Sequence, residues 1–63
     1  MMDEAKLVEA FKELAERAFE SGKRLADMGH YREALDRYEM ALKALELAKL
    51  TNMLKKYAEG GGG

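Results

Sequence analysis

Apolar residues in the first part of the chain recur at alternating intervals of four and three, the spacing of a helix that buries one face. A second row of small and apolar residues runs beside the first, so this face is wider than one neighbouring helix can cover. Asp3 is a suitable N-cap and Glu4 favours the first turn, and we therefore predict a helix over residues 3–28. The first row consists of Leu7, Phe11, Leu14, Ala18, Ser21, Leu25 and Met28, and the second of Val8, Ala15, Phe19, Gly22 and Ala26.

Gly29 ends this pattern, and the apolar spacing starts again two residues later. Glycine takes the left-handed conformation at a helix end at little steric cost, so Gly29 is expected to terminate the first helix. A turn at residues 29–30 is short enough to require two neighbouring antiparallel helices.

A second long helix is predicted over residues 31–58. Few residues between Met40 and Leu50 are polar, so this helix should be buried on more than one side. A break at Thr51 and Asn52, followed by a short third helix, is the alternative, although so short a helix is weak in isolation. The apolar positions are Tyr31, Leu35, Tyr38, Leu42 and Leu45, widened by Ala34, Ala41 and Ala48, and the face continues through Leu47, Leu50, Leu54 and Tyr57.

These elements predict an all-α fold, an antiparallel two-helix hairpin over residues 1–59 followed by a flexible glycine tail at 60–63. One hairpin leaves apolar area uncovered, so we expect self-association to pair two hairpins into a four-helix bundle. Packing within the hairpin is assigned to Leu14, Ala18, Gly22, Leu25, Tyr31, Ala34, Leu35, Tyr38, Ala41, Leu42 and Leu45. The self-association or partner face is assigned to Leu7, Val8, Phe11, Phe19, Met40, Leu47, Leu50, Leu54 and Tyr57.

Small and large residues follow one another in a specific order between residues 15 and 45. The small ones let two helix backbones approach, and the large ones fill the space beside them. This pattern, with a glycine at the turn and an aromatic residue after it, resembles a tetratricopeptide repeat, which is a helix–turn–helix unit. The matching positions are Gly22, Leu25, Gly29, Tyr31, Ala34, Tyr38 and Ala41.

The chain also departs from that family. The closing proline is absent, with Glu46 near its place, and both helices are about twice the usual length for such a repeat. Only one copy of the motif is present, whereas stable solenoids need about three. The stretch from Gly29 to Ala48 is also similar to the trafficking-type MIT three-helix domains, which bind short helical peptides, although here a third helix is missing or too short. Because of these departures, the sequence predicts a self-contained, lengthened hairpin.

Composition excludes several classes of protein. Ala, Leu, Glu, Lys and Arg supply well over half of the 63 residues, as in long helices, and no cysteine is present for disulfides or thiolate chemistry. Net charge is −1, with 11 basic and 12 acidic residues interspersed, so no basic face for nucleic acid is expected. Apolar runs stay far below the roughly 20 residues of a membrane span, which favours a soluble, cytoplasmic protein without membrane contact.

Candidate chemistry is sparse. His30 is the only histidine, and a metal there would need three or four converging ligands, so we interpret it as a surface N-cap with Glu33 in the capping-box place. The carboxylates are interpreted as solvated ion pairs rather than acid–base pairs. We expect no catalytic residue, cofactor or metal. The expected pairs are Glu13 with Arg17, Glu20 with Arg24, Glu33 with Arg37 and Glu39 with Lys43.

The sequence therefore predicts a non-catalytic interaction or scaffold module whose main partner is a second copy, most simply in a homodimer. One alternative is a monomeric adaptor that binds an amphipathic helix of another protein. Another is an engineered self-assembling unit, since the glycine tail and the scarcity of amide side chains fit an idealised design as well as a thermophile protein.

Overall fold

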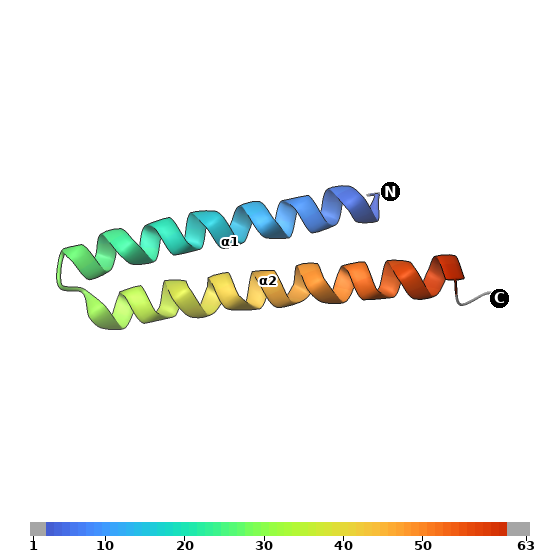
Figure 1. Ribbon diagram of the computed structural model, residues 1–63. Coiled ribbons are helices and arrows are strands. Elements are labelled where there is room, and N and C mark those ends of the chain that lie inside the picture. The colour runs from blue at the N-terminus through green and yellow to red at the C-terminus, as the bar shows by residue number, and fades with distance from the viewer. Residues whose placement is uncertain (1–2, 61–63) are drawn as a thin grey trace.

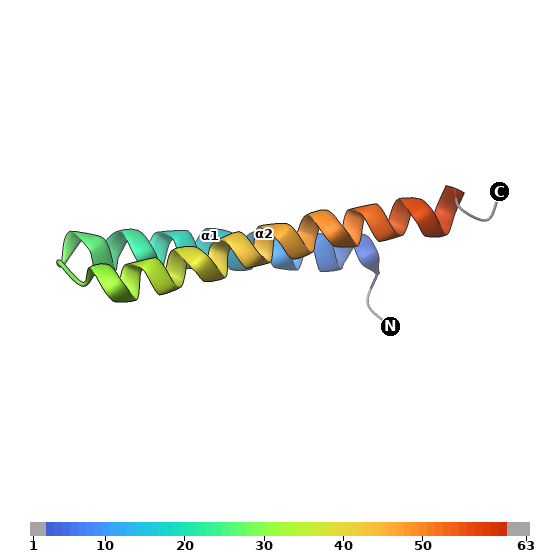
Figure 2. The same cartoon turned by 90° about the horizontal axis from the view of Figure 1, so that it is seen from below.

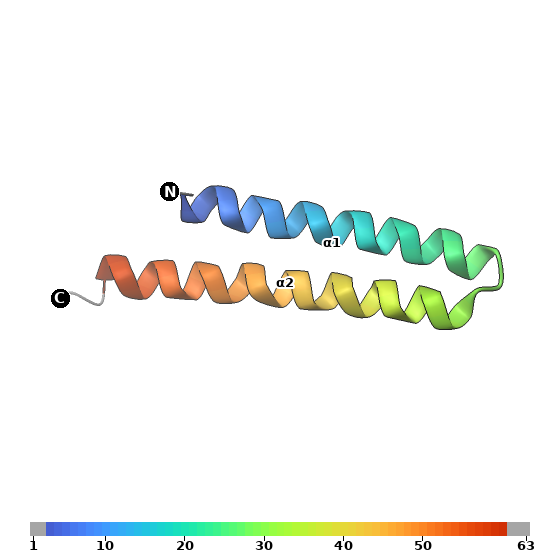
Figure 3. The ribbon, with the colours of Figure 1, turned by 180° about the vertical axis from the view of Figure 1, so that it is seen from behind.

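The structure, a computed structural model, describes residues 3–60 and the side chains of residues 3–58. It consists of α1 (Glu4–Asp27) and α2 (Tyr31–Gly60), which pack side by side in opposite directions (Figure 1), as the view from behind also shows (Figure 3). The predicted all-α fold of two packed helices is confirmed over this range, where no strand occurs. The predicted glycine tail lies outside the described residues, except for Gly60 at the end of α2.

The turn between the helices has the geometry of a Schellman motif. The amide of His30 donates to the carbonyl of Leu25 at 2.8 Å, and the amide of Gly29 donates to the carbonyl of Ala26 at 3.0 Å. Gly29 has a φ of 85°, the left-handed conformation predicted for it from the sequence. The His30 carbonyl then accepts from the Ala34 amide at 2.9 Å, so the second helix begins at once and folds back on the first.

The start of α1 is capped as its sequence predicts. The Asp3 carboxylate accepts a hydrogen bond of 3.3 Å from the amide of Ala5, and its backbone is extended, as at other N-caps. The carbonyl of Asp3 accepts from the amide of Leu7 at 3.0 Å. The first interaction satisfies an amide that the first helical turn leaves without a partner, and the second is the first intrahelical hydrogen bond.

α2 passes through Thr51 and Asn52 without a break. The Thr51 hydroxyl donates to the carbonyl of Leu47 at 2.8 Å, so this side chain bonds to the preceding turn instead of interrupting the helix. With 30 residues against the 24 of α1, α2 projects past the start of α1 (Figure 2). The last turns of α2 therefore have no stretch of α1 opposite them.

The hairpin is long and thin. Its principal extents are 52, 16 and 13 Å, and its radius of gyration is 14.9 Å. A compact domain of this length would have a radius of gyration of about 11 Å. Two helices side by side make a single layer, so every residue lies close to solvent and the buried positions are confined to the line of contact.

Candidate interaction surface

Small residues make the contact between the helices. Val8, Ala15 and Gly22 are buried at seven-residue intervals in α1, and three alanines are buried at the same intervals in α2. A seven-residue interval returns nearly to the same side of a helix, so each set is one row that faces the other helix. The buried residues of α2 are Ala34, Ala41 and Ala48 in this row, with Ala44 beside it.

Gly22 lies against the ring of Tyr38. A Cβ atom at Gly22 would come within 2.7 Å of Cε1 and 2.9 Å of Cδ1 of that ring, which is closer than van der Waals contact allows. The ring also contacts Phe19, whose ring centroid lies 5.9 Å from that of Tyr38. The absence of a side chain at residue 22 therefore lets the tyrosine ring lie over α1. This is the close approach that the sequence pattern predicts for Gly22.

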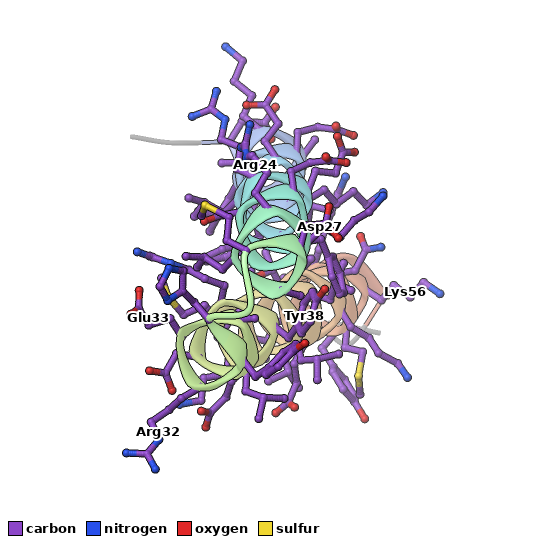
Figure 4. All side chains as sticks on the ribbon, turned by 90° about the vertical axis from the view of Figure 1, so that its left-hand side faces the viewer. Arg24, Asp27, Arg32, Glu33, Tyr38 and Lys56 are labelled. Atoms are coloured by element: carbon purple, nitrogen blue, oxygen red, sulfur yellow. The ribbon has the colours of Figure 1, made fainter. Side chains whose placement is uncertain are left out.

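The Phe19–Tyr38 contact fixes which rows of the two helices lie on the same side of the hairpin. Phe19 follows the buried Ala15 by four residues, and Tyr38 follows the buried Ala34 by four. Residues that follow a buried position by three, or precede it by one, point to the other side. Seen from the turn, Tyr38 and Glu33 lie on opposite sides of the hairpin (Figure 4), as this rule requires.

We call the two surfaces the Phe11 side and the Tyr38 side, and each receives residues from both helices. The Phe11 side contains Leu7, Phe11, Leu14, Ala18, Leu25 and Met28 of α1, with Met40, Ala44, Leu47 and Leu54 of α2. The Tyr38 side contains Phe19 and Ala26 of α1, with Tyr31, Leu35, Tyr38, Leu42 and Leu45 of α2. Leu50, Met53 and Tyr57 lie on the outer face of α2 between them.

Most residues of the Phe11 side are apolar on both helices. Leu14, Met40, Leu47 and Leu54 are 55%, 54%, 46% and 68% exposed, and Leu7 and Phe11 are half-buried. A shallow hollow lined by Val8, Lys12, Leu45, Ala48, Lys49 and Asn52 shows that residues 8–12 of α1 lie opposite residues 45–52 of α2. Phe11 is therefore level with Leu47, and these side chains form one surface across both helices.

On the Tyr38 side, the exposed apolar side chains come from α2. Tyr31, Leu35 and Leu42 are exposed there. The neighbouring rows of α1 are charged, however, and include Lys12 between the apolar positions of that helix. Such a surface resembles the edge of an interface, whereas the Phe11 side resembles its apolar centre. The charged residues that border the Tyr38 side on α1 are Glu9, Glu16 and Lys23.

Several residues assigned to hairpin packing lie elsewhere. Gly22, Ala34 and Ala41 are buried and Ala18, Leu25 and Tyr38 are half-buried, but Leu14, Tyr31, Leu35, Leu42 and Leu45 are exposed. Val8, assigned to the outer face, is buried between the helices. The physical reason is the short distance between two alanine-lined backbones, which leaves no room for leucine or tyrosine side chains between them and directs these to the two sides.

The remaining residues assigned to the self-association or partner face fall into three groups. Leu7, Phe11, Met40, Leu47 and Leu54 share the Phe11 side, Leu50 and Tyr57 lie on the adjoining outer face, and Phe19 lies against Tyr38 on the opposite side. Sequence reasoning left Ala15, Ala44 and Ala48 out of the packing assignment, although all three are buried. The signal for two of them is the strict seven-residue spacing of Val8, Ala15 and Gly22 against Ala34, Ala41 and Ala48.

The polar groups form local contacts. His30 is exposed and belongs to the turn, and among the described residues no group of three or more His, Asp or Glu side chains is arranged to hold a metal ion. Glu39 and Lys43 form one of the predicted ion pairs, with 3.7 Å between Oε2 and Nζ, and both side chains are exposed. Such a pair adds little to stability, so these charges chiefly keep the outer face solvated.

Neither helix, within the part of the chain that the structure describes, is long and apolar enough to cross a membrane. Comparisons with protein-family models, with curated proteins and with solved structures find no match to this chain.

Proposed function

We propose that this chain is a non-catalytic protein–protein interaction module that acts as a scaffold by pairing with a second copy of itself. The observation that carries the proposal is the Phe11 side, an apolar surface built from both helices and open to solvent in a single hairpin. Two such surfaces placed face to face would form a four-helix bundle, the arrangement in which hairpins of this kind cover their apolar rows. A protein of this type is expected in the cytoplasm.

The solvent-exposed area of the chain is large enough to be covered by a second hairpin. The chain exposes 5246 Å² at a mass of 7.1 kDa, whereas a compact monomer of that mass exposes about 4,100 Å². The excess of roughly 1,100 Å² is more than the approximately 800 Å² that each partner contributes to a standard interface. A second hairpin is thus large enough to cover the excess, and burial of apolar area is the driving force for association.

The pairing is tested by the mass in solution, measured by light scattering over a hundredfold dilution, with helix content followed by circular dichroism. We expect the wild-type chain to have the mass of a dimer and to lose helicity only as it dissociates. A folded monomer at every concentration would contradict the proposal, and the Phe11 side would then be the groove of a monomeric adaptor.

A matched pair of variants identifies the surface. Leu47→Glu places a carboxylate at the centre of the Phe11 side and should reduce the dimer to a monomer at the concentration at which the wild type is dimeric. Leu42→Glu makes the same change on the Tyr38 side of the same helix and should leave the dimer mass unchanged. A dimeric Leu47→Glu variant would show that the Phe11 side is not the interface.

A further inference from the structure

The two ends of the Phe11 side differ in polarity. Towards the turn, its rows contain the polar residues Ser21, Glu33 and Arg37 beside Leu25 and Met28. From Met40 to the open end, the same rows contain mostly leucines, Phe11 and alanines, with Thr51 bonded to the carbonyl of Leu47 and Lys55 one turn further on. The apolar surface is thus concentrated near the level of Phe11 and Leu47, in the half of α1 that is remote from the turn. A second copy that is centred at this level buries the fewest charged side chains.

Two hairpins that face each other through the same side can be related by a two-fold axis in two ways. With the axis along the helices, α1 packs on α2 of the second copy and both turns lie at the same end. With the axis across the helices, each helix packs on its own counterpart and the turns lie at opposite ends. The length of α2 distinguishes these arrangements.

The length of α2 favours the axis across the helices. Leu47 lies near the middle of α2, which runs from Tyr31 to Gly60, and α2 projects past the start of α1 (Figure 2). A two-fold axis beside Leu47 pairs α2 with its counterpart over almost its whole length. The projecting last turns of α2, which have no α1 opposite them, then pack on α2 of the second copy. Met40 of one chain comes level with Leu54 of the other.

We propose that the hairpins pair in the antiparallel sense, α1 on α1 and α2 on α2, about an axis beside Phe11 and Leu47, with the turns at opposite ends. This inference rests on the proposed function and specifies its geometry. Each dimer then presents two identical turn ends pointing away from each other. Tyr31 and Leu35, both exposed, lie at each of these ends.

Distances between spin labels test the arrangement, because the chain has no cysteine and a single label site can be introduced. His30→Cys is a suitable site, since His30 is exposed at the turn and contributes backbone hydrogen bonds to it. Leu47 and His30 are 17 positions apart in sequence. At about 1.5 Å per residue, the antiparallel dimer separates the two labels by about 50 Å, and the arrangement with both turns at one end separates them by less than about 25 Å.

The outcomes distinguish a failure of the antiparallel geometry from a failure of self-association. A dimer mass with a label distance near 50 Å supports both, and a dimer mass with a short distance overturns the antiparallel geometry alone. A monomer mass without a dipolar signal overturns the self-association itself. As a second measurement, Leu47→Cys should oxidise readily to a cross-linked dimer and Leu42→Cys should not. Absence of the Leu47→Cys cross-link from a confirmed dimer would also contradict the proposed axis.

Discussion

Replacement of Gly22 by alanine tests whether the close approach of Tyr38 determines the packing of the hairpin. In an ordinary helix this change is stabilising, because alanine is favoured over glycine by about 1 kcal/mol. Here the new Cβ atom would meet the Tyr38 ring at 2.7 Å, and ordinary contact begins near 3.4 Å. The ring would have to move away by several tenths of an ångström, and it already packs against Phe19.

The magnitude follows from these two opposing effects. Overpacking of a well-packed contact costs about 1–3 kcal/mol, and the gain in helix propensity offsets about 1 kcal/mol of it. We therefore expect Gly22→Ala to lower the free energy of unfolding by about 1 kcal/mol. In a Tyr38→Ala background the ring is gone, so the same change should raise the free energy of unfolding by up to about 1 kcal/mol. The coupling between the two positions is then about 2 kcal/mol.

Urea unfolding followed by circular dichroism measures this cycle, with all four proteins at one concentration, because unfolding of an associating chain depends on concentration. Ala10→Gly, on the side of α1 away from α2, calibrates the propensity difference in the same helix. Tyr38→Leu provides a second background if Tyr38→Ala does not fold. Equal stabilisation by Gly22→Ala in the presence and absence of Tyr38 would refute the reasoning, because it would show that the ring does not restrict residue 22.

Two further substitutions test the turn and the contact row. Gly29→Ala should destabilise the hairpin by about 1–2 kcal/mol through backbone strain alone, because φ is 85° and nothing lies within 4 Å of the added Cβ. Gly29→Asn should cost less when both variants are compared by thermal unfolding, and an equal cost would point away from the backbone as the cause. Ala41→Leu adds bulk at a fully buried position, so unfolding should become easier by about 1–3 kcal/mol, whereas Ala5→Leu at an exposed position of α1 should change stability little. Similar effects from both leucines would argue against a close contact at Ala41.

Local features could be predicted from the sequence, and the choice of inward row could not. The cap at Asp3 and the left-handed Gly29 depend on neighbouring backbone groups, so residue type and position suffice. Whether Leu14 or Ala15 faces α2 depends on the distance between the helices. That distance is set by the size of the side chains that both helices bring to the contact. The wide apolar face of α1 is compatible with either residue facing α2, and the prediction from sequence assigns the larger one, Leu14, to the contact. The structure places Ala15 there, because Ala41 and its neighbours in α2 are small enough for close approach.

The alanine-lined contact has a consequence for mutagenesis. Alanine scanning measures the effect of removing a side chain beyond Cβ, and the residues that join these helices have almost nothing to remove. At Ala15, Ala34, Ala41, Ala44 and Ala48 a scan introduces no change, so the most buried part of the molecule gives no signal. The strongest effects on stability or association would come from the outward leucines. The scan would therefore report on the surface of the hairpin and give no information about the contact between its helices. Enlargement of the alanines, one at a time, is the complementary scan that would make the interior visible.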